Sequence, residues 1–545
     1  MTAPATAPTG RRGPGAGGRD PLVGAPWWAW AIPAGFLGWF FVWPMVDVAW
    51  TGLSAPRDAG SSLLDALTTP TVVSAAWFTT WQAVVTTVLT VALGLPAAWA
   101  ASRTGVVGSR AFLAATTVPF VLPTVIVGAA FAELLGPDGP LGVDLRGTAT
   151  AVIAAHVFYN LAVVIRIIGS RWAGIPPDTL EAARTLGAGR WVVFRRVLLP
   201  ALRPSIVAAS SLVFLLSFTS FGTVLILGEL RVRTLEVEIW RQVSQRLDLG
   251  AAAVIALVQL VAVATLLAWY GRAGRTPTPR PGRPAGTGVG ARRVALAILA
   301  ATAVVLAVPL VGLVATSFAG SAGPTLEWYR RLVVDPAPGL DLVSAVGRSL
   351  GYGAIATALA VVVGGAAVVA VTRGGPAGRR FDTAVMLPLG TSAVTIGLGF
   401  LLALDQPIDL RGSWLMVPIA HALVAIPFVV RSTAPTMVSI AADTRAAAVT
   451  LGADRTTVLR RVDWPIARRS LLVGAGFAFA LSLGEFGATT FVGRPADPTL
   501  PILVFRLLGR PGSGGSAAAA AVVLMVVTAL AVLAVDRFRT GREAL

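Results

Sequence analysis

Apolar stretches of about twenty residues recur along the whole chain, and they limit its possible folds more than any other feature. A helix rises about 1.5 Å per residue, so each stretch is long enough to cross the hydrocarbon core of a membrane. With only 13% charged and 55% hydrophobic residues, the composition is typical of a polytopic, all-α membrane protein. Twelve spans are predicted, at residues 27–50, 76–102, 111–135, 148–169, 205–228, 250–271, 294–317, 344–372, 381–404, 412–431, 470–492 and 515–536.

The distribution of arginine predicts how these spans are oriented. Arginine supplies all 44 basic residues; if both termini lie inside, the inner segments hold 29 arginines and 7 acidic residues, against 15 and 19 elsewhere. Because cytoplasmic loops are enriched in basic residues, we expect a multi-pass cell-membrane protein with both termini cytoplasmic. The net charge of +18 is then explained by orientation and by contact with anionic lipid, rather than by nucleic-acid binding. The absence of cysteine excludes disulfides and thiolate metal sites.

A segment rich in Pro, Gly and Arg divides the chain in two. Residues 272–293 cannot build a packed core or cross a membrane, so they are predicted to be a cytoplasmic linker. The other predicted units are a cytoplasmic N-terminal tail (1–26), a first six-span repeat (27–271), a second six-span repeat (294–536) and a cytoplasmic C-terminal tail (537–545).

The two halves repeat each other at a constant offset of 265 residues. Within residues 178–205, 16 of 28 positions are identical to their counterparts, and the same offset carries His156 to His421. Because each repeat has an even number of spans, the two copies are expected to be parallel, related by a pseudo-twofold axis along the membrane normal. A substrate pathway between the two six-helix repeats is the natural consequence.

The segment PPDTLEAARTLGAGRWVVFRRVLLPALRPS, residues 176–205, predicts a cytoplasmic helical hairpin. Asp178 is expected to cap a short helix with Glu181 reaching back, Gly187 to end it in a left-handed turn, and a second helix to stop at Pro200. In the second half Asp443, Gly452 and Pro465 keep these positions, but Ala446 replaces the glutamate, so this hairpin is expected to lack one capping interaction.

These residues carry a resemblance to a known family. Glu181-Ala182-Ala183, Gly187-Ala188 and Pro200 resemble the signature loop of type I, binding-protein-dependent ABC importer permeases, and Ala447-Ala448, Gly452-Ala453 and Pro465 repeat it more weakly. The resemblance implies that each hairpin couples the permease to a separate cytosolic ATPase, expected to be a homodimer, and that an extracytoplasmic binding protein delivers the cargo. The alternative is an amphipathic loop that rests on lipid headgroups.

The chain itself lacks the residues for ATP hydrolysis. A phosphate-binding loop needs a lysine, and the sequence contains none, so ATP and magnesium are expected on the partner ATPase. No catalytic constellation or metal-ligand cluster is evident, and no cofactor is expected. The chain is therefore predicted to be a transport subunit rather than an enzyme.

Polar side chains within the spans are the candidates for the pathway, because such groups are costly at membrane depth. The candidates are Glu133, His156, Ser220, His421 and Glu485. For each the alternative is local: a carboxylate near the outer mouth, or a histidine satisfied by a hydrogen bond between helices. Glu485 precedes Gly487, where a broken span could expose it to the pathway.

Fused two-repeat permeases of this length resemble the thiamine and ferric-iron importers. Segments such as SFTSFGTVLILGELRVRTLEVEIWRQ look closer to the thiamine type, so thiamine is the expected cargo, with ferric iron or another small solute or anion as the alternative. Molybdate-type permeases share the Gly-Glu-Phe-Gly-Ala-Thr run at 484–489 but are usually unfused.

The binding protein is expected to dock on the outer loops 51–73, 229–249, 318–343 and 493–514. A secondary transporter is the alternative class; it would need a coupling-ion site at mid-membrane, often on inverted repeats, whereas these repeats are parallel.

Overall fold

The computed structural model describes residues 24–54, 67–116, 119, 122–137, 139–140, 142–272, 289–320, 323–406 and 409–540. This part of the chain is almost entirely helical, and its only strands are β1 (Ala319–Gly320) and β2 (Gly323–Pro324), which pair antiparallel. Most of the predicted linker (273–288), the outer segment 55–66 and the ends of both tails (1–23 and 541–545) lie outside the described residues.

The helical segments of the first half are, in chain order, α1 (Trp27–Leu37), η1 (Gly38–Val42), α2 (Trp43–Ser54), α4 (Pro70–Arg103), α5 (Ser109–Ala115), α7 (Thr124–Leu134), α8 (Ala149–Ala173), α9 (Pro177–Thr185), α10 (Arg190–Val193), η2 (Phe194–Leu198), α11 (Leu199–Phe218), α12 (Gly222–Leu227), α13 (Leu235–Arg241), η3 (Gln242–Arg246) and α14 (Leu249–Arg272). Segments labelled η are single π-helical turns inside longer helices or at their ends.

The helical segments of the second half are α15 (Val289–Phe318), α16 (Glu327–Val334), α17 (Leu342–Arg373), α18 (Gly375–Gly390), α19 (Ala393–Ala403), α20 (Met416–Ser439), α21 (Ala442–Thr450), α22 (Arg455–Val458), η4 (Leu459–Asp463), α23 (Trp464–Gly484), α24 (Gly487–Val492), α25 (Leu500–Leu508) and α26 (Gly514–Thr540).

The lengths of these helices confirm a polytopic all-α fold with about twelve spans. Among the described residues, ten helices are long and apolar enough to cross a membrane, and there are eleven if α18 and α19, which meet at a bend of 95°, are counted as one span. The predicted span 111–135 is also broken, between α5 and α7. Pro123 immediately precedes α7, and Pro388 lies near the end of α18; proline has no N–H to continue a helical ladder.

The predicted spans 205–228 and 470–492 are placed too late in the sequence. The helices that cross here are Trp191–Phe218 and Arg455–Gly484, and each is followed by a break before α12 or α24. Their first turns are rich in arginine, which hides them from a search for apolar stretches. The expected break beside Glu485 is confirmed, because α23 ends at Gly484 and α24 begins at Gly487.

The structural repeat follows the sequence repeat. From α9 onward each α-helix of the first half begins 265 residues before its counterpart, from α9 and α21 to α14 and α26, and η2 precedes η4 by the same offset. The packing repeats as well. A Cβ on Gly94 would approach Val164 to 2.5 Å, and one on Gly364 would approach Val429 to 3.0 Å, so α4 on α8 and α17 on α20 use the same close contact that glycine permits.

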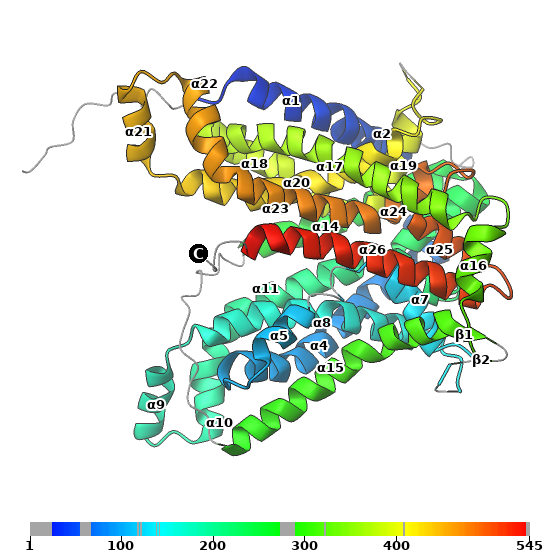
Figure 1. Ribbon diagram of the computed structural model, residues 1–545, viewed down its shortest axis with the longest axis horizontal. Helices are drawn as coiled ribbons and strands as arrows, with labels where there is room; N and C mark the ends of the chain where they lie inside the picture. The colour runs from blue at the N-terminus through cyan, green and yellow to red at the C-terminus, as the bar shows by residue number, and fades with distance from the viewer. Residues whose placement is uncertain are drawn as a thin grey trace, which may run out of the picture.

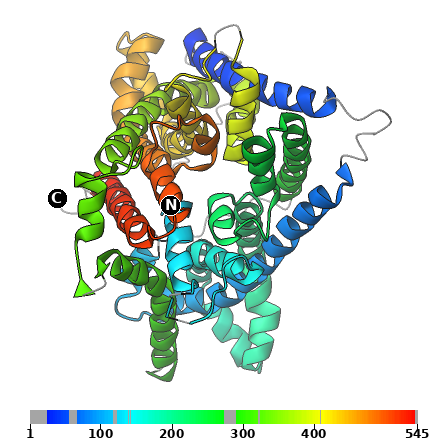
Figure 2. The same ribbon diagram turned by 90° about the vertical axis from the view of Figure 1, so that its right-hand side faces the viewer.

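The first span of each half packs against the other half. Helix α1 contacts α17, and α2 contacts α19, while α15 contacts α4 and α7 in the same way. Each first span also touches the last span of its own half, through α2 with α14 and α15 with α26. Viewed along the bundle, the spans form a ring in which the two repeats are intertwined (Figure 2). The repeats are therefore not independent bundles.

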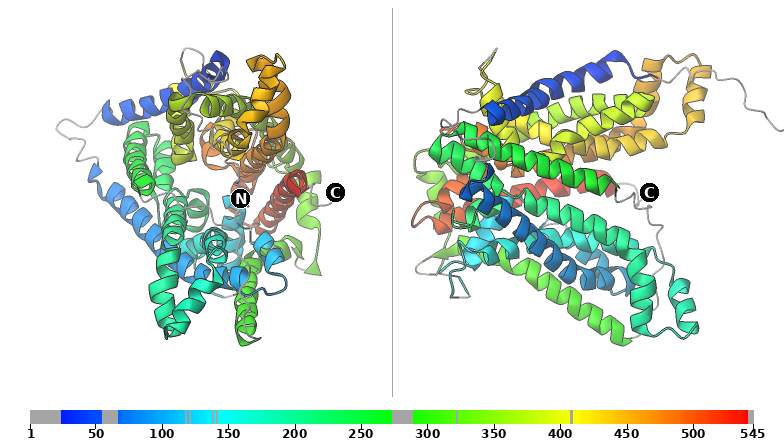
Figure 3. Two further views of the ribbon diagram at one scale, coloured as in Figure 1. Left: turned by 90° about the vertical axis from the view of Figure 1, so that its left-hand side faces the viewer. Right: turned by 180° about the vertical axis from the view of Figure 1, so that it is seen from behind.

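The two groups of helices converge at one end of the molecule and diverge toward the other (Figure 1). At the diverging end, α9 with α10 and α21 with α22 project on opposite sides (Figures 1 and 3). We call this the hairpin end. Helix α1 begins and α26 ends there (Figure 1), so both described ends of the chain lie on the same side as the hairpins.

Candidate functional site

Both hairpins end their first helix in the same glycine-dependent turn. Gly187 has φ 80° and Gly452 has φ 84°, which confirms the predicted left-handed conformation. After α9, the Gly187 N–H donates to Arg184 O at 2.9 Å and the Ala188 N–H donates to Ala183 O at 3.1 Å. The second hairpin repeats both bonds. A helix end closed by these two backbone hydrogen bonds requires a residue that tolerates positive φ. The two bonds also fix the direction in which the chain leaves the helix.

The start of these helices differs from the sequence-based expectation. Asp178 lies in the first turn of α9, the N-cap is Pro176, and no side chain caps the helix. Pro177 is pre-organised for the first helical position and lacks the N–H that would need a partner, so the helix begins two residues earlier than predicted. The predicted cap at Asp178 is therefore wrong. The same holds for Asp443, which lies inside α21 behind its N-cap Ala441.

A side-chain cap is present elsewhere in the second hairpin. Asp454 precedes α22 and accepts a hydrogen bond from the Thr457 N–H at 3.0 Å. Hydrogen bonding from Thr457 holds the pKa of the Asp454 carboxyl below its usual range. The first hairpin has Gly189 at this position. Neither α9 nor α21 has a side-chain cap, so the expected difference at Ala446 is not found, and the second hairpin instead has an added cap at Asp454.

The predicted stop at Pro200 and Pro465 is also wrong. Both prolines lie in the first turn of a long helix, α11 or α23, that continues directly from the π-helical turns η2 and η4. A π turn shifts the hydrogen-bond register, which lets a proline follow without breaking the helix. The second helix of each hairpin is therefore the start of a membrane span.

The tips of the hairpins expose apolar side chains. Leu186 is 87% exposed and Leu451 is 88% exposed, and the two occupy equivalent positions next to the turn glycines. Glu181, Ala182 and Ala447 are also exposed on these helices, while Ala183, Ala188, Ala448 and Ala453 are half-buried. Apolar tips flanked by small residues are suited to close contact with another protein.

The first histidine, His156, is bonded to helix α4 and to the break between α11 and α12. Its Nδ1 lies 3.0 Å from Gln82 Oε1 on α4, and its Nε2 lies 2.8 Å from Ser220 Oγ in the break after α11. Gln82 Nε2 also donates to Ser217 O at 2.8 Å. The side chains of His156, Gln82 and Ser217 are buried, so the cluster joins three elements in the interior. Gln82 is not among the candidates predicted from the sequence, because it lies before the region in which the offset of 265 aligns the two halves.

The second histidine, His421, lies in a more polar cluster. Its Nδ1 is 2.7 Å from Ser482 Oγ, and its Nε2 is 2.8 Å from Thr489 Oγ1 and 3.3 Å from Glu485 Oε2. The Glu485 carboxylate also accepts from the N–H groups of Ala488 and Thr489, at 3.0 and 3.1 Å. Glu485 thus occupies the N-terminal end of α24 and is only 7% exposed. Whether either cluster contacts cargo stays a prediction.

The two halves meet through their equivalent phenylalanines. Phe221 and Phe486, which the offset of 265 relates to each other, stack with ring centroids 5.5 Å apart. Phe505 packs on Phe486 at 5.3 Å and on Trp240 at 6.5 Å, and Trp240 and Phe505 are themselves equivalent. Phe221 and Phe486 lie in the breaks that precede α12 and α24, and both are buried. The sequence repeat contains Phe221 and Phe486, but nothing in it indicates that they touch.

Two cavities flank this aromatic cluster, and Phe505 lines both. The larger, of about 620 Å³, is lined by the half-buried candidate Glu133 together with Glu229, Arg146 and Arg510. Arg146 Nε lies 3.6 Å from Glu229 Oε1 and 2.9 Å from Asp144 Oδ1. The hydrogen bond from Arg146 lowers the pKa of the Asp144 carboxyl. Glu133 therefore lies beside a network of ion pairs in which Arg146 neutralises the carboxylates of Asp144 and Glu229.

The smaller cavity, of about 230 Å³, is the pseudo-symmetric counterpart of the larger. Thr490 and Arg494 line it where Leu225 and Glu229 line the other. The exchange of Glu229 for Arg494 makes the two cavities opposite in charge at this position. The molecule is therefore asymmetric near the aromatic cluster.

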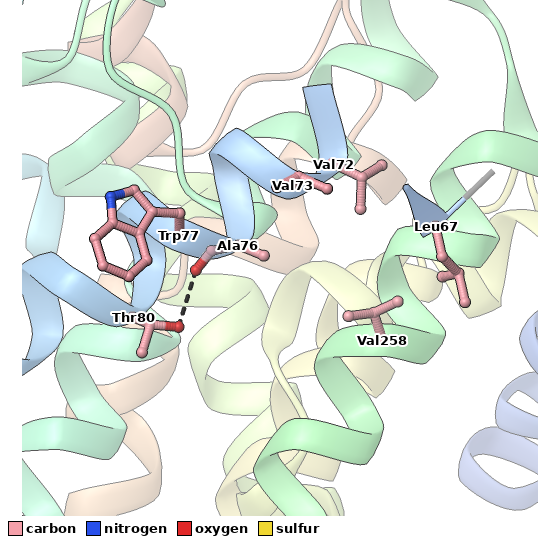
Figure 4. Close-up of a pocket in the computed structure, with 7 residues that line it drawn as sticks. All are labelled: Leu67, Val72, Val73, Ala76, Trp77, Thr80 and Val258. Atoms are coloured by element: carbon pink, nitrogen blue, oxygen red, sulfur yellow. Dashed lines mark hydrogen bonds between the residues drawn. The ribbon is translucent and has the colours of Figure 1, made fainter. Parts of the chain in front are cut away.

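A further groove of about 470 Å³ lies between the start of α4 and α14 (Figure 4). Its lining is apolar except for Thr80, whose hydroxyl donates to Ala76 O at 2.9 Å. With its only hydroxyl satisfied within its own helix, this surface is suited to lipid rather than to a polar cargo. Across the described ranges, no group of three or more His, Asp or Glu side chains could hold a metal ion.

Comparison with known proteins shows which family has a sequence like this one. Residues 90–273 match the family model described as "Binding-protein-dependent transport system inner membrane component". The chain is 30% identical over 457 residues to the "Thiamine transport system permease protein ThiP" of Brucella abortus (strain 2308), covering 79% of this chain and 81% of that protein. It is 26% identical over 445 residues to the protein of the same name from Escherichia coli (strain K12), covering 79% and 83%.

A shorter match links the chain to the "Molybdenum transport system permease protein ModB" of Azotobacter vinelandii, with 34% identity over 170 residues, 29% of this chain and 75% of that protein. The long matches extend over both halves, which a single-repeat relative cannot do. Two parallel six-helix repeats, a multi-pass fold and similarity over most of the chain thus agree, and the chain belongs to the family of type I ABC importer permeases, the inner-membrane components of binding-protein-dependent transport systems.

Proposed function

We propose that this chain imports thiamine, driven by ATP that a separate cytosolic ATPase hydrolyses. The observation that carries the cargo is the similarity, over about four fifths of the chain, to proteins named as thiamine transport permeases. The molybdenum permease matches over less than a third of the chain, so it gives less support for an oxyanion. Ferric iron remains the alternative cargo.

The two hairpins are proposed to be the docking points for the ATPase pair. Two features support this role: Leu186 and Leu451 expose large apolar side chains at the tips, and α10 and α22 continue into membrane spans. A residue that inserts into a groove of a partner needs exposure and a rigid base, and the turns at Gly187 and Gly452 supply that base. ATP and magnesium would be bound by the ATPase.

The hairpin end is proposed to face the cytoplasm. The arginine excess of the inner segments supports this orientation through the positive-inside rule. The start of α1 and the end of α26 lie at the same end, so both termini would be cytoplasmic (Figure 1). The fold sets the relative placement of these elements, and the charge sets which side is inside.

The binding protein is proposed to dock at the opposite end. The predicted docking loops differ in how much apolar surface they expose. Helices α13 and α25, within 229–249 and 493–514, bury most of their apolar side chains in the bundle. Exposed surface is instead offered by α16, where Val333 and Val334 are 49% and 68% exposed. The docking surface is therefore expected to centre on residues 318–343.

Cargo is proposed to cross between the repeats, past the stacked Phe221 and Phe486. The contact of two equivalent rings at the pseudo-twofold axis, near the converging end, would close the pathway toward the outside when the hairpin end is open. A rigid-body separation of the halves would open it, since aromatic stacking is lost once the ring planes part. His156, Ser220, His421 and Glu485 lie in or beside the same breaks and are proposed to support this closure.

The experiment is ATPase stimulation in proteoliposomes that contain this chain and its ATPase, with the binding protein loaded with thiamine or with ferric iron. We expect stimulation and uptake with thiamine and baseline hydrolysis with iron. Stimulation by iron alone would reverse the cargo assignment. Baseline hydrolysis with both would contradict both cargo assignments.

A further inference from the structure

One carboxylate in the second half joins three elements near the hairpin end. Asp463, in η4, is fully buried and forms ion pairs with Arg373 at the end of α17 and with Arg445 in α21. Arg445 Nε lies 3.0 Å from Asp463 Oδ1, and Arg445 Nη2 donates to Met437 O at 2.8 Å. The coupling helix α21 is thereby tied both to the second span and to the start of the fifth.

The first half lacks this junction. Leu198 and Leu180 occupy the positions that correspond to Asp463 and Arg445. Arg103, at the end of α4 as Arg373 is at the end of α17, donates instead to the backbone oxygen of Ile175 at 2.7 Å. It therefore holds Ile175, two residues before α9 begins, and among the described residues it forms no ion pair with the helix itself.

The physics of a buried charge makes the second junction stiff. A carboxylate removed from water is tolerated only while its partners remain in place, so displacing α21 from α17 would leave buried charges without partners. The Arg373 and Asp463 side chains are 9% and 0% exposed, so water cannot replace either partner at low cost. A backbone oxygen that accepts one bond, as in the first half, resists displacement less.

We propose that Asp463 is a positioning residue for ATP-driven transport. It holds the α21 coupling helix in fixed register with α17, so that movement of the ATPase subunit beneath this hairpin is passed to two spans of the second half. The proposal rests on the proposed function, because it assumes that α21 receives force from an ATPase. It further implies that the second hairpin is attached to its membrane spans more rigidly than the first.

The test compares Asp463→Asn with Asp454→Asn in proteoliposomes that contain the ATPase and thiamine-loaded binding protein. Asp454 is an exposed carboxylate of the same hairpin, and asparagine is an equally good N-cap, so this control should behave as wild type. For Asp463→Asn we expect the ATP hydrolysed per thiamine imported to rise by about fivefold or more, in the range of site-to-site coupling energies. Asp463→Glu, which keeps the charge, should restore most of the coupling.

A second measurement needs neither cargo nor ATPase. The chain contains no cysteine, so spin labels can be placed on Ala447→Cys with Ala377→Cys, and in the first half on Ala182→Cys with Ala111→Cys. Asp463→Asn should broaden the distance distribution of the 447–377 pair and leave the 182–111 pair unchanged. If Asp463→Asn fails to insert, Arg445→Gln, which leaves the pair with Arg373 in place, should give the same change in smaller measure.

The outcomes separate two failures. Normal coupling and an unchanged 447–377 distribution in Asp463→Asn or Arg445→Gln would overturn the role of Asp463. A merely structural role would lower the amount of inserted permease without raising the ATP cost per thiamine, and this too would overturn it. A wild-type chain that imports no thiamine would contradict the proposed function, while the spin-label result would still decide whether Asp463 fixes α21.

Discussion

The two hairpins have the same backbone but different attachments. Their helices begin and end at equivalent residues, and both turn at a glycine with positive φ beside an exposed leucine. Beneath this shared surface, Arg103 donates to a backbone oxygen just before the first hairpin, whereas the buried Asp463 pairs with two arginines in the second. The comparison teaches that a duplicated unit can keep its exposed surface while its connection to the membrane spans diverges.

The largest effect is expected where the hairpins are alike. Replacing Gly187 and Gly452 with valine together should abolish ATP-driven thiamine uptake and leave membrane insertion intact, because a branched residue at positive φ costs about 1–2 kcal/mol and reorients the tip. Uptake by proteoliposomes is the measurement. Gly189→Ala, at a glycine without positive φ, is the control. Unimpaired uptake by the double variant would break the idea of a shared coupling surface.

The exposed leucines should contribute equally. Leu186→Asp and Leu451→Asp are each expected to weaken binding of the ATPase to nanodisc-embedded permease by about tenfold or more, since burying a leucine contributes about 1.5–3 kcal/mol. Affinity measured for each single variant and for the pair would sharpen the comparison. A silent substitution at one tip would mean that only one hairpin docks.

The polar clusters around His156 and His421 should differ in how much they contribute to stability. Glu485→Ala removes the acceptor of two backbone N–H groups and the neighbour of His421, so we expect a loss of about 2–3 kcal/mol in stability. Ser220→Ala, at the equivalent position, removes one neutral bond to His156 and should cost about 1 kcal/mol. Thermal unfolding in detergent measures both. Equal losses would contradict the asymmetry, and unchanged cargo dependence in Glu485→Ala would remove it as a pathway residue.

The smallest effect is expected at the contact between the halves. Phe221→Leu or Phe486→Leu should raise the ATP-independent leak of thiamine, up to about tenfold, because an aromatic pair contributes about 0.5–1.5 kcal/mol. The two variants should match, since the rings are each other's partners. Phe214→Leu, in a stacked pair within α11, is the control and should not leak. A leak in the control alone would place the closure elsewhere.

The fold could be predicted from the sequence because length and hydropathy decide which segments cross a membrane. The repeat offset then aligned the hairpins and both histidines, and the left-handed turns at Gly187 and Gly452 followed from their position after a short helix. The start of the fifth span in each half was missed because Arg195 and Arg196 fall within a helix that continues through a π turn. Local polarity concealed a continuous helix.

The side-chain contacts of the candidate site could not be predicted in the same way. Gln82 and His156 are 74 residues apart, and Arg373 and Asp463 are 90 apart, so only the packed fold brings them together. One signal was available for Asp463: it interrupts the repeat where the first half has Leu198, and an acid beside a span needs a partner. The hydropathy of the sequence also gives no sign that the first span of each half packs against the other half.

The most direct test of the central claim is cross-linking between the hairpin tips and the ATPase. Because the chain has no cysteine, Leu186→Cys and Leu451→Cys provide single attachment points for a bifunctional reagent that reaches a lysine on the ATPase. We predict one ATPase subunit attached to either single variant, and two subunits attached to the double variant. Absence of any adduct, while an outer control such as Val334→Cys is labelled normally, would contradict the account of two coupling hairpins.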